Sequence, residues 1–157
     1  VFGEDPKTFD DRKAAEQGNS SAQYEVASYL LAGTIVPRDI DAGVMWCRKA
    51  AEQGHVEAQY ALGICYTKGV GVPAGLADAA RWYRMAAEQG YQDAQYALGQ
   101  CYLKGRGVPR DRALAYMWCS LAGRGYELKR KVSGREAREG ERLANEWREK
   151  HQKPAEK

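Results

Sequence analysis

A five-residue segment, Ala-Ala-Glu-Gln-Gly, occurs three times in this chain of 157 residues. Its copies begin at Ala14, Ala50 and Ala86, so the spacing is 36 residues each time. Alanine, tyrosine, glycine, proline and tryptophan recur between the copies with the same step, and no insertion or deletion breaks it. Such a period is the signature of stacked repeats, each of which buries its apolar face against its neighbours. The predicted units are residues 14–49, 50–85 and 86–121.

Each unit is predicted to contain two helices, as the second unit shows. In Glu57–Lys68, apolar residues at steps of three and four share one helical face, namely Ala58, Leu62, Cys65, Tyr66 and Gly69. The glycines and the proline of residues 69–73 end this helix. A second helix follows over Asp78–Glu88, and its apolar face consists of Ala79, Trp82, Tyr83 and Ala86. The equivalent tryptophans Trp46, Trp82 and Trp118 are expected in the core between helices.

Two features of the units indicate how the helices are capped and packed. Asp39 and Asp111 precede second helices and are expected to cap them. Gly63 and Gly99 lie inside first helices, where a glycine costs about 1 kcal/mol relative to alanine. We expect these glycines to allow close approach of a neighbouring helix. Because a single helix pair cannot cover its own apolar face, the sequence predicts an all-α solenoid of stacked pairs.

The two ends of the chain depart from the repeat pattern, as expected for the caps of an array. Residues 1–13 are predicted to form an N-terminal partial helix or cap, with Asp5 as N-cap before a first-turn proline. Residues 122–150 are predicted to form a C-terminal capping helix, whose charged part spans residues 135–150. Residues 151–157 are predicted to be a disordered tail.

The motif of the second unit resembles the Sel1-like repeat, a relative of the tetratricopeptide repeat. It is carried by Ala58, Leu62, Gly63, Tyr66, Gly69, Gly71, Val72, Ala80, Trp82, Ala86, Ala87 and Gly90. The third unit matches equally well through Leu98, Gly99, Tyr102, Gly105, Gly107, Val108 and Trp118, and the first unit is looser. The resemblance implies a right-handed, tetratricopeptide-like superhelix of antiparallel helix pairs that serves as an interaction scaffold.

In the related tetratricopeptide fold, the first helix of each unit lines a concave surface. We therefore predict that the non-core face of the first helices binds a peptide or protein segment. The predicted binding residues are Tyr24, Ser28, Leu31, Glu57, Tyr60, Ile64, Thr67, Lys68, Asp93, Tyr96, Gln100, Leu103 and Lys104. Tyr24, Tyr60 and Tyr96 share one repeat position, and tyrosine is a common anchor in interfaces. Packing between units is the alternative role of these tyrosines, and the sequence leaves both open.

Composition excludes several classes of protein. With 24 basic and 21 acidic residues the net charge is +3, which argues against nucleic-acid binding. No uncharged apolar run approaches the ~20 residues of a membrane span. The protein is expected to be a monomer. Residues 124–157 hold 11 basic and 7 acidic side chains. Within them, Lys129–Lys131 is predicted to be either a solvated link or a contact for an acidic partner.

Residues for catalysis, cofactor binding or metal binding do not converge in the sequence. Of the two histidines, His55 lies in a variable turn, where an exposed and non-catalytic role is expected, and His151 falls in the tail. No His-Glu-x-x-His or Cys-x-x-Cys spacing occurs, and no serine has a lysine three residues later. The Gly105–Gly107 turn lacks the third glycine of a dinucleotide-binding fingerprint. The sequence therefore predicts no catalytic residue, cofactor or metal, and no enzyme.

The four cysteines fall at two repeat positions, Cys65 with Cys101 and Cys47 with Cys119. In an antiparallel helix pair, Cys47 and Cys65 lie within roughly 3 Å of one another along the axis. This spacing allows a Cys47–Cys65 disulfide if the chain is exported. The other interpretation is that all four are reduced and serve as small buried apolar groups.

Two functions from different classes follow from these observations. The first is a non-catalytic scaffold or adaptor for a peptide or protein segment. The second is a secreted or periplasmic effector, or a modulator of enzymes, whose activity no motif reveals. The resemblance to Sel1-like repeat proteins, which at this size are often bacterial and exported, implies the periplasm or the outside of the cell, whereas the unpaired cysteines favour the cytoplasm.

Overall fold

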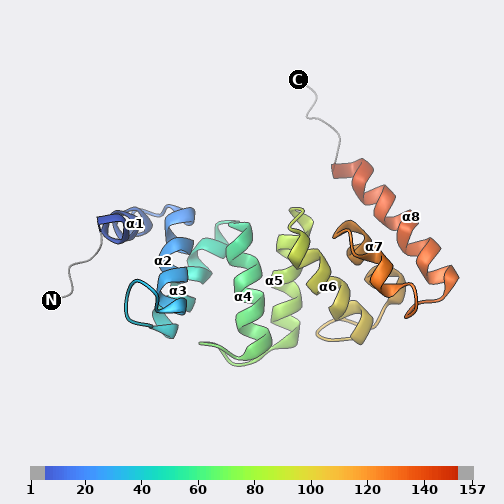
Figure 1. Cartoon of the computed structure of the whole chain (residues 1–157), viewed down its shortest axis with the longest axis horizontal. Helices are drawn as coiled ribbons and strands as arrows, with labels where there is room; N and C mark the ends of the chain where they lie inside the picture. The colour runs from blue at the N-terminus through green and yellow to red at the C-terminus, as the bar shows by residue number, and fades with distance from the viewer. Residues whose placement is uncertain (1–5, 152–157) are drawn as a thin grey trace, which may run out of the picture. The chain divides into compact units, whose positions relative to one another are not determined.

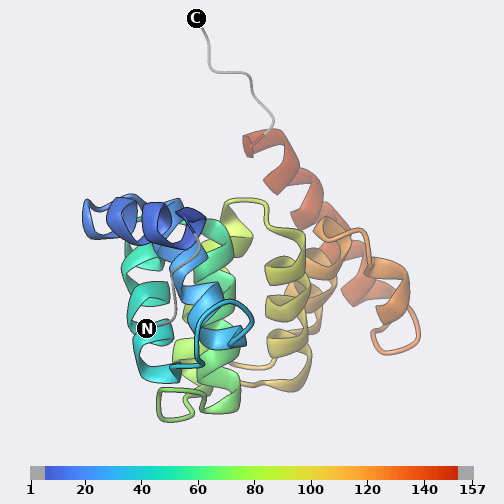
Figure 2. The same ribbon diagram turned by 60° about the vertical axis from the view of Figure 1, so that its left-hand side comes forward.

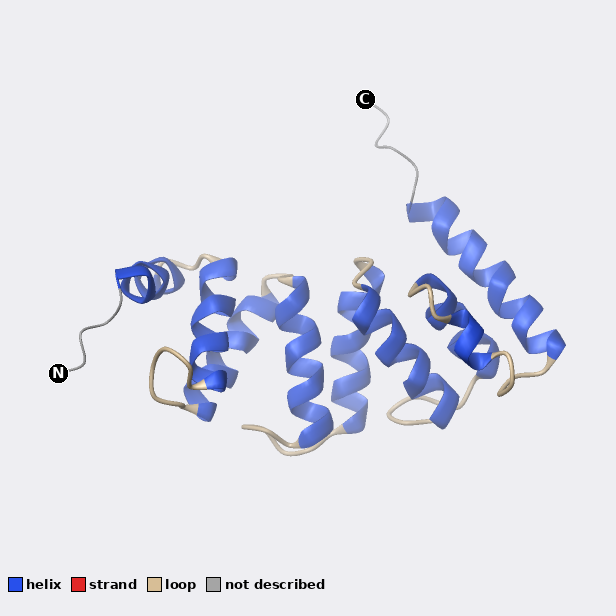
Figure 3. Ribbon diagram, viewed as in Figure 1, coloured by secondary structure: helices blue, strands red, loops and turns tan. Residues whose placement is uncertain are grey.

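The computed structural model describes residues 6–151 of the chain, and this part contains helices and no strand (Figures 1 and 3). The helices are α1 (Pro6–Glu16), α2 (Ser20–Ala32), α3 (Ile40–Glu52), α4 (Val56–Lys68), α5 (Leu76–Glu88), α6 (Gln92–Lys104), α7 (Arg112–Leu121), the 3-10 helix η1 (Gly125–Leu128) and α8 (Gly134–His151). None of these helices is both long and apolar enough to cross a membrane.

The chain divides into two compact units, and the boundary between Ala86 and Ala87 falls in the last turn of α5. In the first unit, α1 packs on α2, α2 on α3 and α3 on α4. The connection after α4 then reverses the chain, so that α4 and α5 run antiparallel (Figure 1). In the second unit, α6 packs on α7, and α7 packs on both η1 and α8 (Figure 2). The predicted all-α architecture of helix pairs is confirmed.

Polar N-caps and glycine C-caps determine where the helices begin and end. The side chains of Asp39 and Asp111 each accept a hydrogen bond from the backbone N–H three residues later, at 3.0 and 2.9 Å, as predicted. The first helices α2, α4 and α6 end at Gly33, Gly69 and Gly105, whose φ angles are 67°, 68° and 67°. Glycine adopts this left-handed conformation without steric cost, which explains its recurrence at this position.

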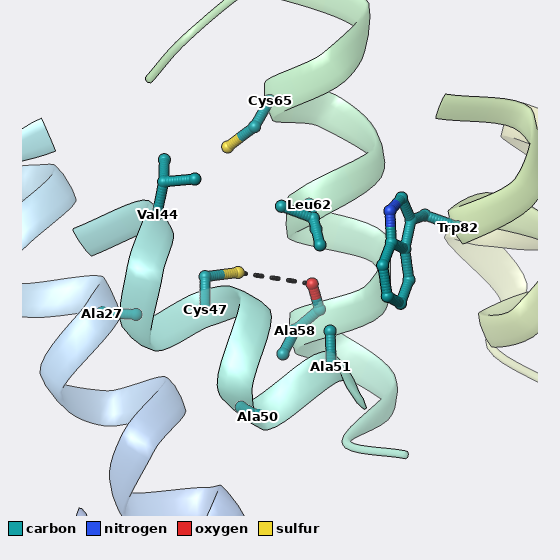
Figure 4. Close-up of a cluster of buried hydrophobic side chains, with 9 residues drawn as sticks. All are labelled: Ala27, Val44, Cys47, Ala50, Ala51, Ala58, Leu62, Cys65 and Trp82. Carbon is teal, nitrogen blue, oxygen red and sulfur yellow. Dashed lines mark hydrogen bonds between the residues drawn. The ribbon is translucent and has the colours of Figure 1, made fainter. Parts of the chain in front are cut away.

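The core of the first unit consists mainly of small side chains from α2 to α5 (Figure 4): Ala27, Val44, Cys47, Ala50, Ala51, Ala58, Leu62, Cys65 and Trp82. The predicted apolar face of α5 is buried throughout. On α4, Tyr66 is half-buried, and Gly69 is exposed at the end of the helix. Trp46 is half-buried, whereas Trp82 and Trp118 are buried as predicted. Trp46 packs at the rim of a small cluster of α1 and α2 residues, which covers it incompletely.

Glycines inside the first helices lie where two helices approach closely, as predicted. A Cβ atom at Gly63 would lie 2.5 Å from Cε1 of Tyr83 on α5. A Cβ atom at Gly99 would lie 2.5 Å from Sγ of Cys119 on α7. Real Cβ atoms are essentially never found so close to another heavy atom, so a side chain at either position displaces its neighbour.

The C-terminal helix α8 covers α7 in the second unit. A Cβ atom at Gly140 would lie 2.6 Å from the carbonyl oxygen of Ala113, so the two helices are in close contact. Ala144 is fully buried one turn later. Trp147 meets Trp118 edge to face, with 6.3 Å between the ring centroids. A predominantly charged helix thus attaches through a narrow apolar stripe.

Some boundaries differ from the predicted ones. Helix α5 begins at Leu76, before the expected Asp78, and η1 was not predicted. Helix α8 includes His151, which was expected in the tail. The predicted N-cap Asp5 and residues 152–157 of the predicted tail lie outside the described residues.

Candidate functional site

Histidine, cysteine and carboxylate side chains form no cluster that could hold a metal ion within residues 6–151. His55, expected to be exposed, is half-buried because it is the N-cap of α4. Its Nδ1 accepts a hydrogen bond from the N–H of Ala58 at 3.4 Å. Its ring stacks on that of Tyr24, with the centroids 4.9 Å apart. These contacts give His55 a structural role in the turn.

All four cysteines are free thiols in the structure. Burial raises the pKa of Cys47 and of Cys119 to about 12, and it also raises the pKa of Cys65 and Cys101. Thiolates are scarce at neutral pH under these conditions, which makes the side chains poor nucleophiles. Cys47 and Cys65 belong to the same buried cluster (Figure 4), where the Cys47 thiol donates to the carbonyl oxygen of Ala58 at 3.4 Å. The structure thus agrees with reduced cysteines, of which Cys47, Cys65 and Cys119 are buried and Cys101 is half-buried.

Tyr24 and Tyr60 occupy matching positions on α2 and α4 of the first unit, and both are half-buried. Tyr24 stacks on His55 at the start of the next helix. Tyr60 tilts against Tyr83 of α5, with 5.7 Å between the ring centroids. Each ring therefore packs against a neighbouring ring, and part of each side chain remains accessible to solvent. Packing is thus observed at this repeat position, and the binding role stays a prediction for the accessible part of each ring.

Tyr96, the third member of the series, lies on α6 in the second unit and contacts a charged pair. Its hydroxyl donates a hydrogen bond to Oε2 of Glu127 at 2.8 Å. The guanidinium of Arg124 lies 3.5 Å from the centroid of the Tyr96 ring and donates to Oε1 of Glu127 at 2.7 Å. The hydrogen bond to Glu127 and, next, burial raise the pKa of Tyr96. Hydrogen bonds from Arg124 and Tyr96 lower the pKa of Glu127.

The other predicted binding residues of the first unit differ in exposure. Glu57, Thr67 and Lys68 are exposed on α4, whereas Ser28, Leu31 and Ile64 are half-buried. The Thr67 hydroxyl donates to the carbonyl oxygen of Gly63 and lies 2.9 Å from the Tyr83 hydroxyl. Leu31 packs against the core cluster. The α4 residues therefore provide most of the accessible surface of this predicted site.

In the second unit, Asp93 and Lys104 are exposed on α6, and Gln100 is half-buried. Leu103, in contrast, is buried, so the prediction that it belongs to an exposed binding face is wrong. Its apolar side chain packs into the unit at the end of α6, where helical periodicity alone placed it on the non-core face.

Three buried glutamines were missed in the sequence. The side-chain amides of Gln23, Gln59 and Gln95 each donate to a backbone carbonyl eight residues earlier, at 3.1, 3.1 and 3.2 Å. These carbonyls lie in the last turn of the preceding helix, where each also accepts the backbone N–H of the glycine three residues later at 3.0 Å. The 36-residue spacing of the glutamines was the available signal, because a polar residue repeated inside a core indicates a fixed hydrogen bond.

A family model described as the Sel1 repeat matches residues 20–55, 56–91 and 92–125, which together make up more than half of the chain. The chain belongs to the Sel1 repeat family. Each Sel1 match begins at the start of a first helix, six residues after the corresponding unit defined from the sequence. The period is the same in both divisions.

Solved structures of Sel1 proteins resemble this chain. A Sel1 repeat protein from Oxalobacter formigenes is 34% identical with a TM-score of 0.71, and the match covers 78% of this chain and 92% of that one. The protein c5321, described as a protective antigen of uropathogenic Escherichia coli with an SLR fold, is 28% identical with a TM-score of 0.67. That match covers 90% of this chain and 40% of c5321. No curated protein matched the sequence.

Proposed function

We propose that this Sel1 protein is a non-catalytic scaffold that binds a peptide or protein segment on the exposed faces of its first helices. The main observation in support is that Tyr24 and Tyr60, at one repeat position, are half-buried, each with its ring against a neighbouring ring. Because these contacts restrict the rings before a partner arrives, binding loses little side-chain entropy. Tyrosine then contributes a large contact area and a hydroxyl group.

The surroundings of these tyrosines support recognition of a peptide. On α4, Glu57, Thr67 and Lys68 are exposed at helical positions on the same side as Tyr60 and add polar groups, including one acidic and one basic side chain. An apolar ring bordered by polar side chains is the usual composition of a protein interface. Neither a metal-binding cluster nor an activated thiol accompanies the tyrosines within residues 6–151.

A peptide-library selection on the intact chain tests this proposal. Peptides selected on the parent protein are expected to bind a Tyr24→Ala/Tyr60→Ala variant at least about tenfold more weakly, because this variant lacks both proposed interface anchors. The matched control is Met45→Ala/Met85→Ala, which removes two exposed apolar side chains from second helices. Equal loss in both variants, or no loss in the tyrosine variant, would refute the proposed surface. Turnover by the purified protein in a hydrolase panel would refute the non-catalytic role.

We also propose that the protein acts in the periplasm or outside the cell. The four thiols are compatible with an oxidising compartment because burial raises their pKa values and so disfavours the reactive thiolate. Fractionation of the source cells tests this proposal, and recovery of the protein in the cytoplasm would support the alternative location.

A further inference from the structure

A pocket of the second unit is lined mainly by cationic side chains. Its volume is about 560 Å³, and its walls are Leu103, Lys104, Arg110, Arg112 and Lys131. Leu103 and Lys104 end α6, Arg110 lies in the connection from α6 to α7, Arg112 begins α7, and Lys131 lies in the link between η1 and α8. Figure 1 shows this connection between α6 and α7 in gold and the link before α8 in orange. Four of its five lining residues are positively charged.

The other two repeats show that the fold does not need these charges. Lys104, Arg110 and Arg112 each have an equivalent residue one period and two periods earlier in the sequence. They are Lys68, Ala74 and Leu76 in the second repeat and Ala32, Arg38 and Ile40 in the first. Each earlier repeat therefore carries one cation where the third carries three. The apolar counterparts of Arg112 also begin their helices, so helix formation at this position does not depend on arginine.

The cations of the pocket have no ion-pair partner among residues 6–151. None of the four comes within 4.0 Å of a carboxylate oxygen in that part of the chain. The carboxylate of Asp111, between the two arginines, is the N-cap of α7 and accepts from Leu114. The carboxylate of Glu136 accepts the N–H of Ser133 at 2.6 Å, and this hydrogen bond is the main cause of its lowered pKa. Arg112 and Arg110 contribute less to that shift.

A larger hollow in the first unit provides a contrast. Its volume is about 1180 Å³, and it lies beside α1, the connection from α2 to α3 and the start of α3. The charged residues that line it are Arg12, Arg38, Asp39 and Asp41, so the charges balance. The unbalanced positive charge is therefore a property of the third-repeat pocket and not of every hollow in this Sel1 protein.

We propose that the third-repeat pocket binds a short acidic segment of a protein partner. Arg110 and Arg112 present planar guanidinium groups that pair with Asp or Glu carboxylates through two hydrogen bonds, and Lys104 and Lys131 add positive charge. The positive end of the α7 macrodipole adds to the attraction. Leu103 also lines the pocket, but only 8% of this residue is exposed, so the accessible wall is mainly cationic. This inference rests on the proposed role as a peptide-binding scaffold and identifies the chemistry of its partner.

A short peptide fits this site better than an extended polyanion. The volume of the pocket lies within the ~300–1,000 Å³ typical of ligand sites, so it accommodates a compact group of side chains. In the neighbouring helix α8, five basic and five acidic side chains balance, and Glu139 and Glu146 pair with Arg142, so the positive charge of the pocket does not continue along this helix. A nucleic-acid site would instead continue as a basic stripe.

The experiment measures binding of a fluorescein-labelled peptide with Glu at alternate positions around a central Leu. Fluorescence anisotropy on the full chain is expected to show binding that weakens as salt is added, since exposed charges are screened. The matched peptide with Gln in place of Glu is expected not to bind. Arg110→Glu/Arg112→Glu is expected to lower the affinity at least about tenfold, as for loss of charge-assisted hydrogen bonds. Lys13→Glu/Lys49→Glu, the same change of charge at exposed positions of α1 and α3, is the control.

Several outcomes would overturn the inference. These are absence of binding at low salt, equal binding of the Glu and Gln peptides, and equal affinity of the pocket and control variants. Stronger competition by inorganic phosphate, phosphatidylserine vesicles or single-stranded DNA than by unlabelled Glu peptide would also overturn it. If the double reversal does not fold, as judged by circular dichroism, Arg110→Gln/Arg112→Gln replaces it. The Tyr24→Ala/Tyr60→Ala variant and the library-selected peptides test the tyrosine surface, whereas the arginine variant and the Glu peptide test the pocket. Either proposal can therefore fail without the other.

Discussion

Substitution of Gly63 by alanine is expected to destabilise the protein, although alanine is the better helix former. Helix propensity alone favours alanine by about 1 kcal/mol. The new Cβ, however, would lie 2.5 Å from Cε1 and 2.6 Å from Cδ1 of Tyr83. That ring is buried, and its hydroxyl lies 2.9 Å from the Thr67 hydroxyl, so it cannot move freely. Overpacking of this kind costs about 1–3 kcal/mol, which leaves a net loss of roughly 1 kcal/mol.

The first repeat contains the complementary pair of residues. Ala27 corresponds to Gly63, and Cys47 corresponds to Tyr83, so a small partner accompanies the residue that has a Cβ. Both Ala27 and Cys47 are fully buried in one cluster. Tyr83→Cys alone creates a cavity and is expected to cost about 3 kcal/mol. In the Gly63→Ala/Tyr83→Cys variant the Cβ occupies part of that cavity, and the double variant is expected to be more stable than additivity predicts.

Urea unfolding of the parent, both single variants and the double variant measures this coupling as a double-mutant cycle. We expect a favourable coupling of about 1–2 kcal/mol, since the overpacking in one variant fills the space lost in the other. Ala27→Gly is the control, because it removes a Cβ without relieving a clash and is expected only to destabilise. Increased stability of Gly63→Ala, or additivity within about 0.5 kcal/mol, would refute the packing argument.

Three further predictions concern the core, a buried amide and the charged pair. Trp82→Ala is expected to lower the free energy of unfolding by about 3–5 kcal/mol. Trp82→Phe is expected to lower it by less, because the buried Nε1 of Trp82 has no hydrogen-bond partner among residues 6–151 and its loss breaks no bond. Chemical denaturation measures both variants. Gln59→Leu is expected to cost about 1 kcal/mol, since it removes the hydrogen bond from the buried side-chain amide to the carbonyl oxygen of Ala51; thermal unfolding checks this against the exposed Gln17→Leu. The lowered pKa of Glu127 gives stability that is present above its ordinary value of 4.5 and is lost as the pH falls through the lower folded-state pKa. Melting curves across this range should differ between the parent and Glu127→Gln above pH 4.5 and converge in acid; parallel curves would contradict the linkage.

The repeat pattern predicted the helix pairs and their close contacts because these depend on residues that lie within one period. Gly63 and Gly99 were assigned to helix contacts from their position alone, and the structure places a neighbouring helix at each. Trp46 is less buried than Trp82 and Trp118 because the helix pair that precedes a repeat covers its tryptophan. Before the first repeat, α1 stands in place of a full helix pair. A periodic argument assigns the same environment to every copy, and it therefore fails at the ends of an array.

The candidate site was predicted less completely. The surface of Tyr96 depends on Arg124 and Glu127, which lie beyond the last full unit, where the repeat provides no template. The cationic pocket likewise includes Lys131 from the link before α8. Contacts between the repeats and a non-repeating segment depend on where that segment returns to the array, and no local spacing encodes this.

The buried glutamines have a consequence for how such a chain changes in length. Gln23, Gln59 and Gln95 make the same bond to a carbonyl eight residues earlier, and the bond joins the end of one pair to the start of the next. Every joint therefore has the same donor and the same acceptor. Excision of the 36 residues from Gln23 to Ala58 brings Gln59 into the place of Gln23, with the matching carbonyl already there. Gene duplication or deletion in whole periods can thus lengthen or shorten the protein without a new joint having to evolve.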